Sequence, residues 1–183
     1  MLVLSFDPFP TLTTDRFVLR NVSPNDVNEM FVMRSDPRII PHRLPCQSSD
    51  EAMAYIQKLH DEQAIGKSIT WVIQLKENPK LIGTVCFWNI QPEYDRAEIG
   101  YALLTDYHRQ GIMTEVLPPV LKYGFETMKL HSVEGHVDPT NAGSVKVLER
   151  NGFVREGHFK ENCKFPDGRY RDTYVYSLLA QNR

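Results

Sequence analysis

The stretch that decides the fold is Tyr107-His108-Arg109-Gln110-Gly111-Ile112-Met113-Thr114-Glu115, which follows Ala97-Glu98-Ile99-Gly100-Tyr101-Ala102-Leu103-Leu104. An apolar strand leads into a short polar loop with one glycine, and a helix with periodic apolar residues follows. At the start of a helix several backbone N–H groups lack partners within the helix, and the helix dipole favours negative charge. This order therefore suits the binding of an anionic group, although a plain strand-to-helix connection has the same order.

Length and composition predict the class of protein. A chain of 183 residues with 42% hydrophobic and 24% charged residues is typical of a soluble, globular, single domain, here residues 1–183. The formal net charge of −2 argues against a general basic surface for nucleic acid or for an anionic membrane. The three cysteines are far apart and predict reduced thiols in the cytoplasm, with neither a disulfide framework nor a metal site. We see no signal peptide and no run of membrane-spanning length, so we expect no membrane partner.

Apolar periodicity and turn residues predict alternating strands and helices. The predicted strands lie at residues 17–19, 69–75, 81–88, 96–104, 132–137, 153–162 and 171–178, and the predicted helices lie at about 23–34, 48–66, 111–128 and 138–152. Short turns join the strands from 69 to 104, which indicates an antiparallel meander. The strand–helix–strand order from 96 to 137 predicts that strand 132–137 runs parallel to strand 96–104 or to a neighbour of it. Pro118-Pro119 inside a helix predicts a kink or an irregular turn.

Strand 96–104 has two different faces. Glu98, Gly100 and Ala102 alternate with bulkier residues, so one face is small and carries a carboxylate. A strand with a small face leaves room for another molecule to lie on it.

Three motifs together resemble the Gcn5-related N-acetyltransferase (GNAT) superfamily. Glu98-Ile99-Gly100-Tyr101 is similar to the fourth strand of that family, and His108–Met113 is similar to its acetyl-CoA signature. The segment from Asn141 to Phe153 resembles its N-x-x-[A/S]-x-x-x-[Y/L]-x-x-x-G-F pattern. The segment from Leu12 to Arg20, with Asp36-Pro37, resembles the RimJ/RimL-type branch, which acetylates the N-termini of ribosomal proteins.

The resemblance implies a fold, an activity and a set of partners. The implied fold is the GNAT fold of the α/β (α+β) class: a mixed, mostly antiparallel sheet of about seven strands, helices on both faces, and a cofactor cleft between the fourth and fifth strands. The implied activity transfers the acetyl group of acetyl-CoA to a primary amine, either a protein N-terminal α-amino group or a small-molecule amine, directly in a ternary complex. The expected partners are acetyl-CoA and the acceptor, with no metal and no nucleic acid, and the protein is expected to be a monomer or a homodimer.

The resemblance also assigns the cofactor contacts. It implies that backbone N–H groups of about residues 109–114 bind the pyrophosphate, and that an N–H group of the Tyr101–Leu104 segment meets the oxyanion. The expected cofactor-binding residues are Leu103, Leu104, Arg109, Gln110, Gly111, Ile112, Met113, Thr114, Asn141 and Ser144. His108 and Met113 depart from the signature, which usually has Gln or Arg and a small residue there, so Met113 must turn away from the phosphates.

Acetyl transfer requires a neutral amine and a way to stabilise the leaving thiolate. An α-amino group has a reference pKa of about 7.7–8.0, so a base needs to give only modest help. Glu98 is the candidate base, directly or through a water molecule. Its alternative roles are those of a half-exposed strand glutamate or of an ion-pair partner for Arg96 or for an arginine of the cleft. Many family members have a tyrosine at the position of Leu148, and Ser144 is the remaining candidate to donate a proton or a hydrogen bond to the sulfur.

Two questions stay open at the level of the sequence. A catalytically silent acyl-CoA-binding module is the alternative to an enzyme, and Met113 and the missing tyrosine favour that alternative. The loop at 36–48 carries Arg38, His42 and Arg43, which could recognise a carboxylate on the acceptor.

Overall fold

The predicted strands form one mixed sheet in the computed structural model, which describes residues 1–182. The strands are β1 (Leu12–Thr13), β2 (Phe17–Asn21), β3 (Ile69–Leu75), β4 (Asn78–Gln91), β5 (Arg96–Leu103), β6 (Ser132–Val137), β7 (Val154–Lys164) and β8 (Tyr170–Leu179). The α-helices are α1 (Val27–Ser35), α2 (Ser49–Ala64), α3 (Ile112–Lys122) and α4 (Ala142–Arg150).

The sheet has the order β1-β2-β3-β4-β5-β6-β8-β7. Strands β3 to β5 form the predicted antiparallel meander, and β2 pairs antiparallel with β3. Strand β6 runs parallel to β5, as predicted, but the two pair only between residues 96–98 and 132–134. Strand β7 lies at one edge and pairs with β8, and its register is irregular at two points. The predicted fold is confirmed with eight strands instead of about seven, because two residues of the lead-in pair with β2 as β1.

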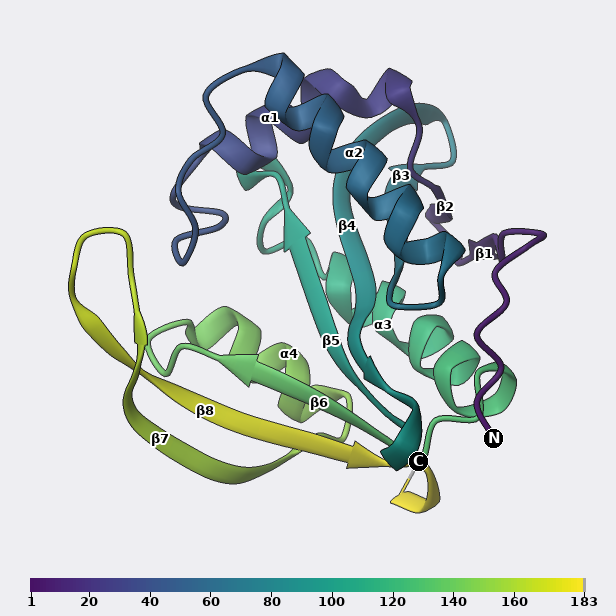
Figure 1. The fold of residues 1–183 in the computed structure, drawn as a ribbon, viewed down its shortest axis with the longest axis vertical. Helices are drawn as coiled ribbons and strands as arrows, with labels where there is room; N and C mark the ends of the chain where they lie inside the picture. Colours follow the sequence, from purple (N-terminus) through teal and green to yellow (C-terminus); the bar gives the residue numbers. More distant parts are fainter. Residues whose placement is uncertain (183) are drawn as a thin grey trace.

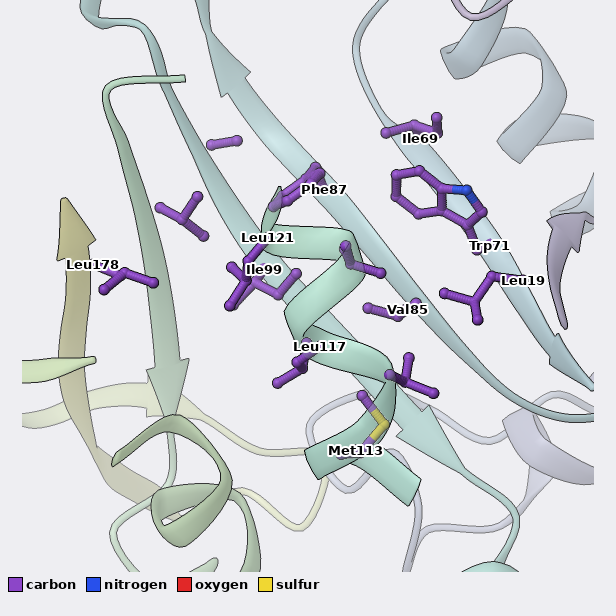
Figure 2. Close-up of a cluster of buried hydrophobic side chains, with 14 of the residues drawn as sticks. Leu19, Ile69, Trp71, Val85, Phe87, Ile99, Met113, Leu117, Leu121 and Leu178 are labelled. Atoms are coloured by element: carbon purple, nitrogen blue, oxygen red, sulfur yellow. The ribbon is translucent and has the colours of Figure 1, made fainter. Parts of the chain in front are cut away.

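The four helices cover both faces of the sheet (Figure 1). Helices α1 and α2 pack on one face, over a core that includes Val72 of β3. Helices α3 and α4 pack on the other face, over a core that includes Trp71 and Ile73 of the same strand. Figure 2 shows Trp71 in this layer. The alternation of side chains along a strand therefore divides the core into two layers.

The structure corrects the prediction for Pro118-Pro119. Helix α3 continues through both prolines, and the irregular turn is a π turn at Tyr123–Thr127. The carbonyl groups that lose their N–H partners belong to Thr114 and Glu115 in the first helical turn. Thr114 is an exposed residue and Glu115 a half-buried one, so water can replace the missing donors. In the π turn Gly124 passes so close to Phe87 that a Cβ atom would lie 2.7 Å from its ring.

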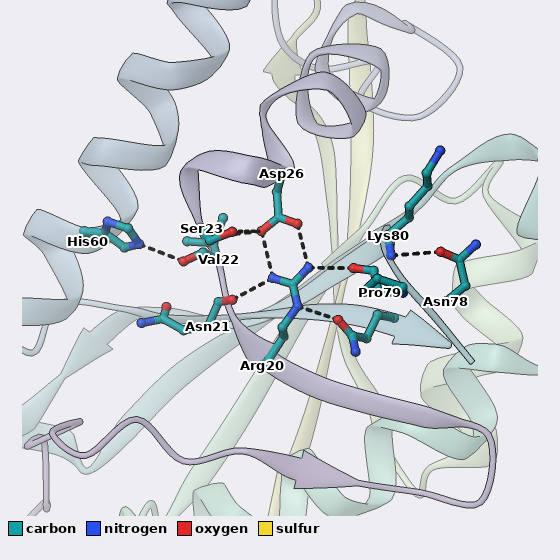
Figure 3. A network of polar contacts seen from close by, with 10 residues as sticks. Arg20, Asn21, Val22, Ser23, Asp26, His60, Asn78, Pro79 and Lys80 are labelled. Atoms are coloured by element: carbon teal, nitrogen blue, oxygen red, sulfur yellow. Dashed lines mark hydrogen bonds and ion pairs between the residues drawn. The ribbon is translucent and has the colours of Figure 1, made fainter. Parts of the chain in front are cut away.

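A partly buried ion pair between Arg20 and Asp26 links β2 to the start of α1 (Figure 3). Arg20 of β2 donates to both carboxylate oxygens of Asp26 at 2.6 and 2.8 Å, and to the carbonyl oxygens of Asn21 and Pro79. The same carboxylate accepts from the N–H group of Ser23 at 2.8 Å. The Asp26 side chain is only 4% exposed, so removing either partner would leave the other charge without a counter-charge where water reaches it poorly.

We predict that Asp26→Asn lowers the free energy of unfolding by about 2–3 kcal/mol, because it leaves the Arg20 charge without a counter-charge. Urea unfolding followed by circular dichroism measures this loss. Lys58→Ala is the matched control: it removes one member of the exposed Lys58–Glu62 pair and should change stability by less than about 1 kcal/mol. Equal losses in the two variants would contradict this role for Asp26.

Candidate active site

The loop between β5 and α3 has the backbone of an anion-binding turn. Arg109 and Gly111 both have positive φ angles, 62° and 71°. Nothing lies within 4 Å of the place where a Cβ of Gly111 would stand, so the glycine is required by its backbone conformation and not by space. Ser48 caps α2 and Asn141 caps α4 through their side chains, whereas Gly111 offers α3 none. The first N–H groups of α3 are therefore available to a ligand.

Two side-chain hydrogen bonds hold this loop in place. The Nε2 atom of His108 lies 3.0 Å from the carbonyl oxygen of Leu103, and the amide of Gln110 donates to the carbonyl of Asp106 at 2.8 Å. His108, which departs from the signature, thus ties the loop to the end of β5.

A second set of contacts holds the loop from outside. Glu115 accepts from the hydroxyl of Thr14 at 2.6 Å, and from the N–H group and the Nε of Arg16 at 2.9 and 2.6 Å. Arg16 also reaches the carbonyl of Gln110 at 3.3 Å. Burial tends to raise the pKa of Glu115, but these hydrogen bonds outweigh it and lower the pKa. The carboxylate thus stays charged and ties the beginning of the chain to the first turn of α3.

Met113 and Ile112 point into the core beneath the loop. They are 6% and 2% exposed, and Figure 2 shows Met113 beside Leu117 among the buried side chains of the α3 layer. Only their backbone N–H groups can face a ligand at the helix end. This packing explains how the signature tolerates a methionine at this position.

A cavity of about 810 Å³ opens above the loop, between β5 and the start of α4. Nine of the ten predicted cofactor residues line it, and they are Leu103, Arg109, Gln110, Gly111, Ile112, Met113, Thr114, Asn141 and Ser144. The cationic side chains in its lining are Arg38, Arg109, Lys146, Arg150 and Arg171, against the single carboxylate of Asp138. The cavity therefore suits a large anionic ligand.

Leu104, the tenth predicted residue, does not line the cavity. Its N–H group donates to the carbonyl of Ile82 in β4 at 2.9 Å, and its side chain packs in the core layer of α1 and α2. Because N–H directions alternate along a strand, the N–H groups of Tyr101 and Leu103 point to the other side, where β6 has separated from β5. Sequence reasoning could not choose within Tyr101–Leu104, because the choice depends on the pairing with β4.

Glu98 lies at the last residue pair before β5 and β6 separate. It is 8% exposed and lies on the α1–α2 face, while Tyr101 and Leu103 face the other layer and line the cavity. Burial raises the pKa of Glu98 and the nearby Glu134 adds to this effect, whereas His136 and a hydrogen bond from Asn89 oppose it. Arg96 pairs with Glu134 at 2.8 Å, so no ion pair between Arg96 and Glu98 is formed.

Ser144 lies in the first turn of α4 and faces a side chain that sequence reasoning missed. The hydroxyl of Tyr101 is 2.8 Å from the Oγ atom of Ser144. Asn141 accepts from the N–H group of Ser144 at 3.0 Å, which leaves its amide N–H₂ free for a ligand. Leu148 is 1% exposed in the core. The alternation along β5 placed Tyr101 on the face of Leu103, but no sequence signal showed that this face meets α4.

The loop at 36–48 lies beside the tip of the β7–β8 hairpin (Figure 1). Arg38 lines the main cavity, and Arg43 lines a smaller cavity of about 380 Å³ between this loop and the hairpin. His42 lies outside both linings and is exposed; partial desolvation by the surrounding loop, together with the charge of Arg43, lowers its pKa. The three residues are therefore not brought together in one site.

Within residues 1–182, no group of three or more His, Cys, Asp or Glu side chains is arranged to hold a metal ion. None of the helices in that range combines the length and the apolar character that crossing a bilayer requires.

A separated pair of parallel strands, a cationic cavity and an uncapped helix start therefore lie together in this mixed α/β fold. The sequence family described as "Acetyltransferase (GNAT) domain" matches residues 16–154. The chain therefore belongs to the GNAT family and is an N-acetyltransferase.

Relatives span nearly the whole chain. An uncharacterised N-acetyltransferase p20 of Bacillus licheniformis is 33% identical over 173 residues, covering 93% of this chain and 97% of its own length. The [ribosomal protein uS5]-alanine N-acetyltransferase of Escherichia coli is 26% identical, covering 94% and 92% of the two chains. The spermidine N(1)-acetyltransferase of Vibrio cholerae is 27% identical, covering 92% and 97%.

Solved structures agree with the fold. A GNAT-family acetyltransferase of Bacillus anthracis superimposes with a TM-score of 0.80 at 26% identity, covering 94% of this chain and 99% of that chain. The spermidine N-acetyltransferase of Vibrio cholerae, solved with CoA and spermine, has a TM-score of 0.81 at 23% identity, covering 91% and 96%.

We predict that Met113→Ala lowers the free energy of unfolding by about 2–4 kcal/mol, because it leaves a cavity in the core. It should not tighten the binding of acetyl-CoA, since the side chain points away from the main cavity. Thermal unfolding and calorimetric titration with acetyl-CoA measure the two effects. Met113→Leu keeps the volume and should cost less than about 1.5 kcal/mol. Tighter binding at unchanged stability would show instead that the methionine occupies the ligand site.

Proposed function

We propose that this protein transfers the acetyl group of acetyl-CoA to a primary amine, directly within a ternary complex. The observation that carries the proposal is the cationic cavity that ends at the uncapped start of α3. In the proposed complex the N–H groups at 109–114 bind the pyrophosphate, while Arg109, Lys146 and Arg150 add positive charge. These residues, with Leu103, Gln110, Thr114, Asn141 and Ser144, form the proposed cofactor site.

The separation of β5 from β6 supports a reaction in which the thioester and the amine approach β5 from opposite faces of the sheet. The thioester would lie along β5 with its carbonyl oxygen near the N–H groups of Tyr101 and Leu103, which are free of β4. The acceptor amine would approach from the α1–α2 side, where Glu98 lies at the point of separation. Glu98, directly or through a water molecule, would take the proton of the attacking amine. A buried carboxyl of raised pKa is a stronger base than an exposed one, which suits this role.

The acceptor is a protein N-terminal α-amino group or a small amine. The relatives from Escherichia coli and Vibrio cholerae are named for one acceptor of each class, an alanine of a ribosomal protein and spermidine. We propose that one domain formed by residues 1–183 does this in the cytoplasm without a metal, as a monomer or a homodimer.

The test measures thiol release from acetyl-CoA with a panel of N-terminal peptides, amino acids and polyamines. The wild-type protein should release CoA only with an acceptor, and mass spectrometry after acetyl-CoA alone should show no acetylated protein. If acetyl-CoA binds but no acceptor of the panel gives turnover, the protein is an acyl-CoA-binding module and the proposal is wrong.

We predict that Glu98→Gln lowers kcat by about 100-fold, a typical contribution of a general base. The wild-type rate should fall as the pH falls through the raised pKa of Glu98, above the ordinary glutamate value of about 4.3. The variant should lose this acid limb and keep the limb that reports the ionisation of the acceptor amine. An unchanged acid limb in the variant would assign that ionisation to another group.

The stability of Glu98→Gln separates catalysis from folding. Because burial raises the pKa of Glu98, its protonated form favours the folded state, and this contribution is present at low pH and is lost as the pH rises through the raised value. At pH 7 the neutral glutamine removes the cost of burying a charge. The variant should therefore be at least as stable as the wild type in urea unfolding, so that a loss of activity cannot be attributed to unfolding.

A further inference from the structure

A hydrogen bond joins two of the elements that line the main cavity, β5 and α4. Tyr101 from β5 and Ser144 from the first turn of α4 both line the cavity, and their hydroxyl oxygens are 2.8 Å apart. The same phenol lies 3.4 Å from the carbonyl oxygen of Ser144. Two residues that are 43 positions apart thus place two hydroxyl groups in contact at the point where β5 meets α4.

The chemistry of the two groups sets the direction of this hydrogen bond. A phenol is the stronger acid, with a reference pKa of about 10, so it is the better donor to an alcohol oxygen. The contact permits either hydroxyl to donate, and the carbonyl oxygen of Ser144 is a second, more distant acceptor for the phenol at 3.4 Å. With the phenol donating to the closer Oγ atom, Ser144 accepts from Tyr101 and keeps its own proton to donate elsewhere. The hydroxyl proton of Ser144 is therefore free to point into the cavity.

Tyr101 does not supply the proton itself. Burial raises the pKa of Tyr101 to about 12, and the contact with Ser144 only partly opposes this shift. At neutral pH the phenol thus stays protonated, and it is a weaker acid than an exposed tyrosine. Its effect is that of a fixed donor, which polarises the serine hydroxyl and makes it a better donor in turn.

We propose that Tyr101 is a positioning residue that directs the hydroxyl of Ser144 to the sulfur of the thioester. The inference rests on the acetyl transfer proposed above. The amine nitrogen forms the bond to the acetyl carbon, the carbon–sulfur bond breaks, and the proton of the amine goes to Glu98. The electron pair of the broken bond stays on the sulfur, where Ser144 donates a hydrogen bond to the thiolate. The thiolate is then protonated by solvent, so neither hydroxyl group loses its proton.

The contacts around α4 leave this role to Ser144. The other residues of α4 that line the cavity are Ala142, Gly143, Lys146, Val147 and Arg150. None of them has a hydroxyl group, and Leu148 packs in the core. Within the described residues the donor that α4 presents beside Tyr101 is therefore the serine, and its orientation depends on the phenol.

The experiment is a double-mutant cycle with Tyr101→Phe, Ser144→Ala and the double variant. Each single variant should lower kcat by about tenfold, the effect of losing one hydrogen bond to a charged group. The KM for acetyl-CoA should stay within twofold, because the hydrogen bond to sulfur strengthens only as charge develops. The double variant should be no slower than Ser144→Ala, since Tyr101 acts through the serine.

Tyr123→Phe is the matched control. Tyr123 is half-buried, lies in the π turn against Trp71, lines neither cavity, and has no hydrogen-bonded hydroxyl among the described contacts. The loss of the Tyr123 hydroxyl should leave kcat unchanged. Thermal unfolding should show Tyr101→Phe folded like the wild type, because the ring remains.

The outcomes are distinct. Effects of Tyr101→Phe and Ser144→Ala that multiply in the double variant would overturn the inference, as would full activity of Tyr101→Phe. If a rise in KM accounted for the whole loss of kcat/KM, the Tyr101–Ser144 contact would serve only to bind acetyl-CoA, and the inference would be wrong. If the wild-type protein turns over no acceptor, the proposed function fails and this inference fails with it, whereas an active wild type confines the failure to Tyr101.

Discussion

The site depends on the short pairing between β5 and β6. The two strands share only three residue pairs. Beyond Glu98, β5 pairs only with β4, and β6 pairs only with β8. Backbone N–H and C=O groups on this edge of β5 therefore lack a partner in β6. Backbone polar groups that are removed from water require a hydrogen-bond partner of some kind. A ligand with amide groups of its own can supply that partner. The same separation opens β5 to the main cavity, whose lining includes Tyr101, Ala102 and Leu103.

The core supports this opening from below. Helix α3 presents its first N–H groups to the cavity only because Ile112 and Met113 anchor its first turn in the apolar layer. Glu115 and Arg16 fix the outer side of the same turn to the lead-in of the chain. The loop thus has apolar contacts beneath it and charged contacts outside it, and its free backbone groups lie between the two. Binding to such a preformed loop requires little ordering of the protein.

Local patterns in the sequence predicted most of the fold and the direction of some side chains at the candidate site. Alternation along β5 separated Glu98 from Tyr101 correctly, since a strand has only two faces. Met113 was expected to turn away from the phosphates, and its burial supplies the reason. Contacts that join distant segments were not predictable. The pairs Tyr101–Ser144 and Arg16–Glu115 depend on how whole elements pack, and the partner of Arg96 was Glu134 because β6 lies beside β5.

The two edge strands of the sheet, β1 and β7, differ in length, but neither favours the addition of another strand. Strand β1 has two residues, too few to serve as a template for another strand. Strand β7 has eleven residues and is exposed, but it carries five charged side chains, two irregularities of register, and Glu161 with a φ of 48°. Such an edge resists the addition of a foreign strand, because charges and a broken ladder oppose pairing. The sheet is thus closed to extension at both ends, which protects a long exposed hairpin from aggregation and directs any association of copies to surfaces formed by side chains.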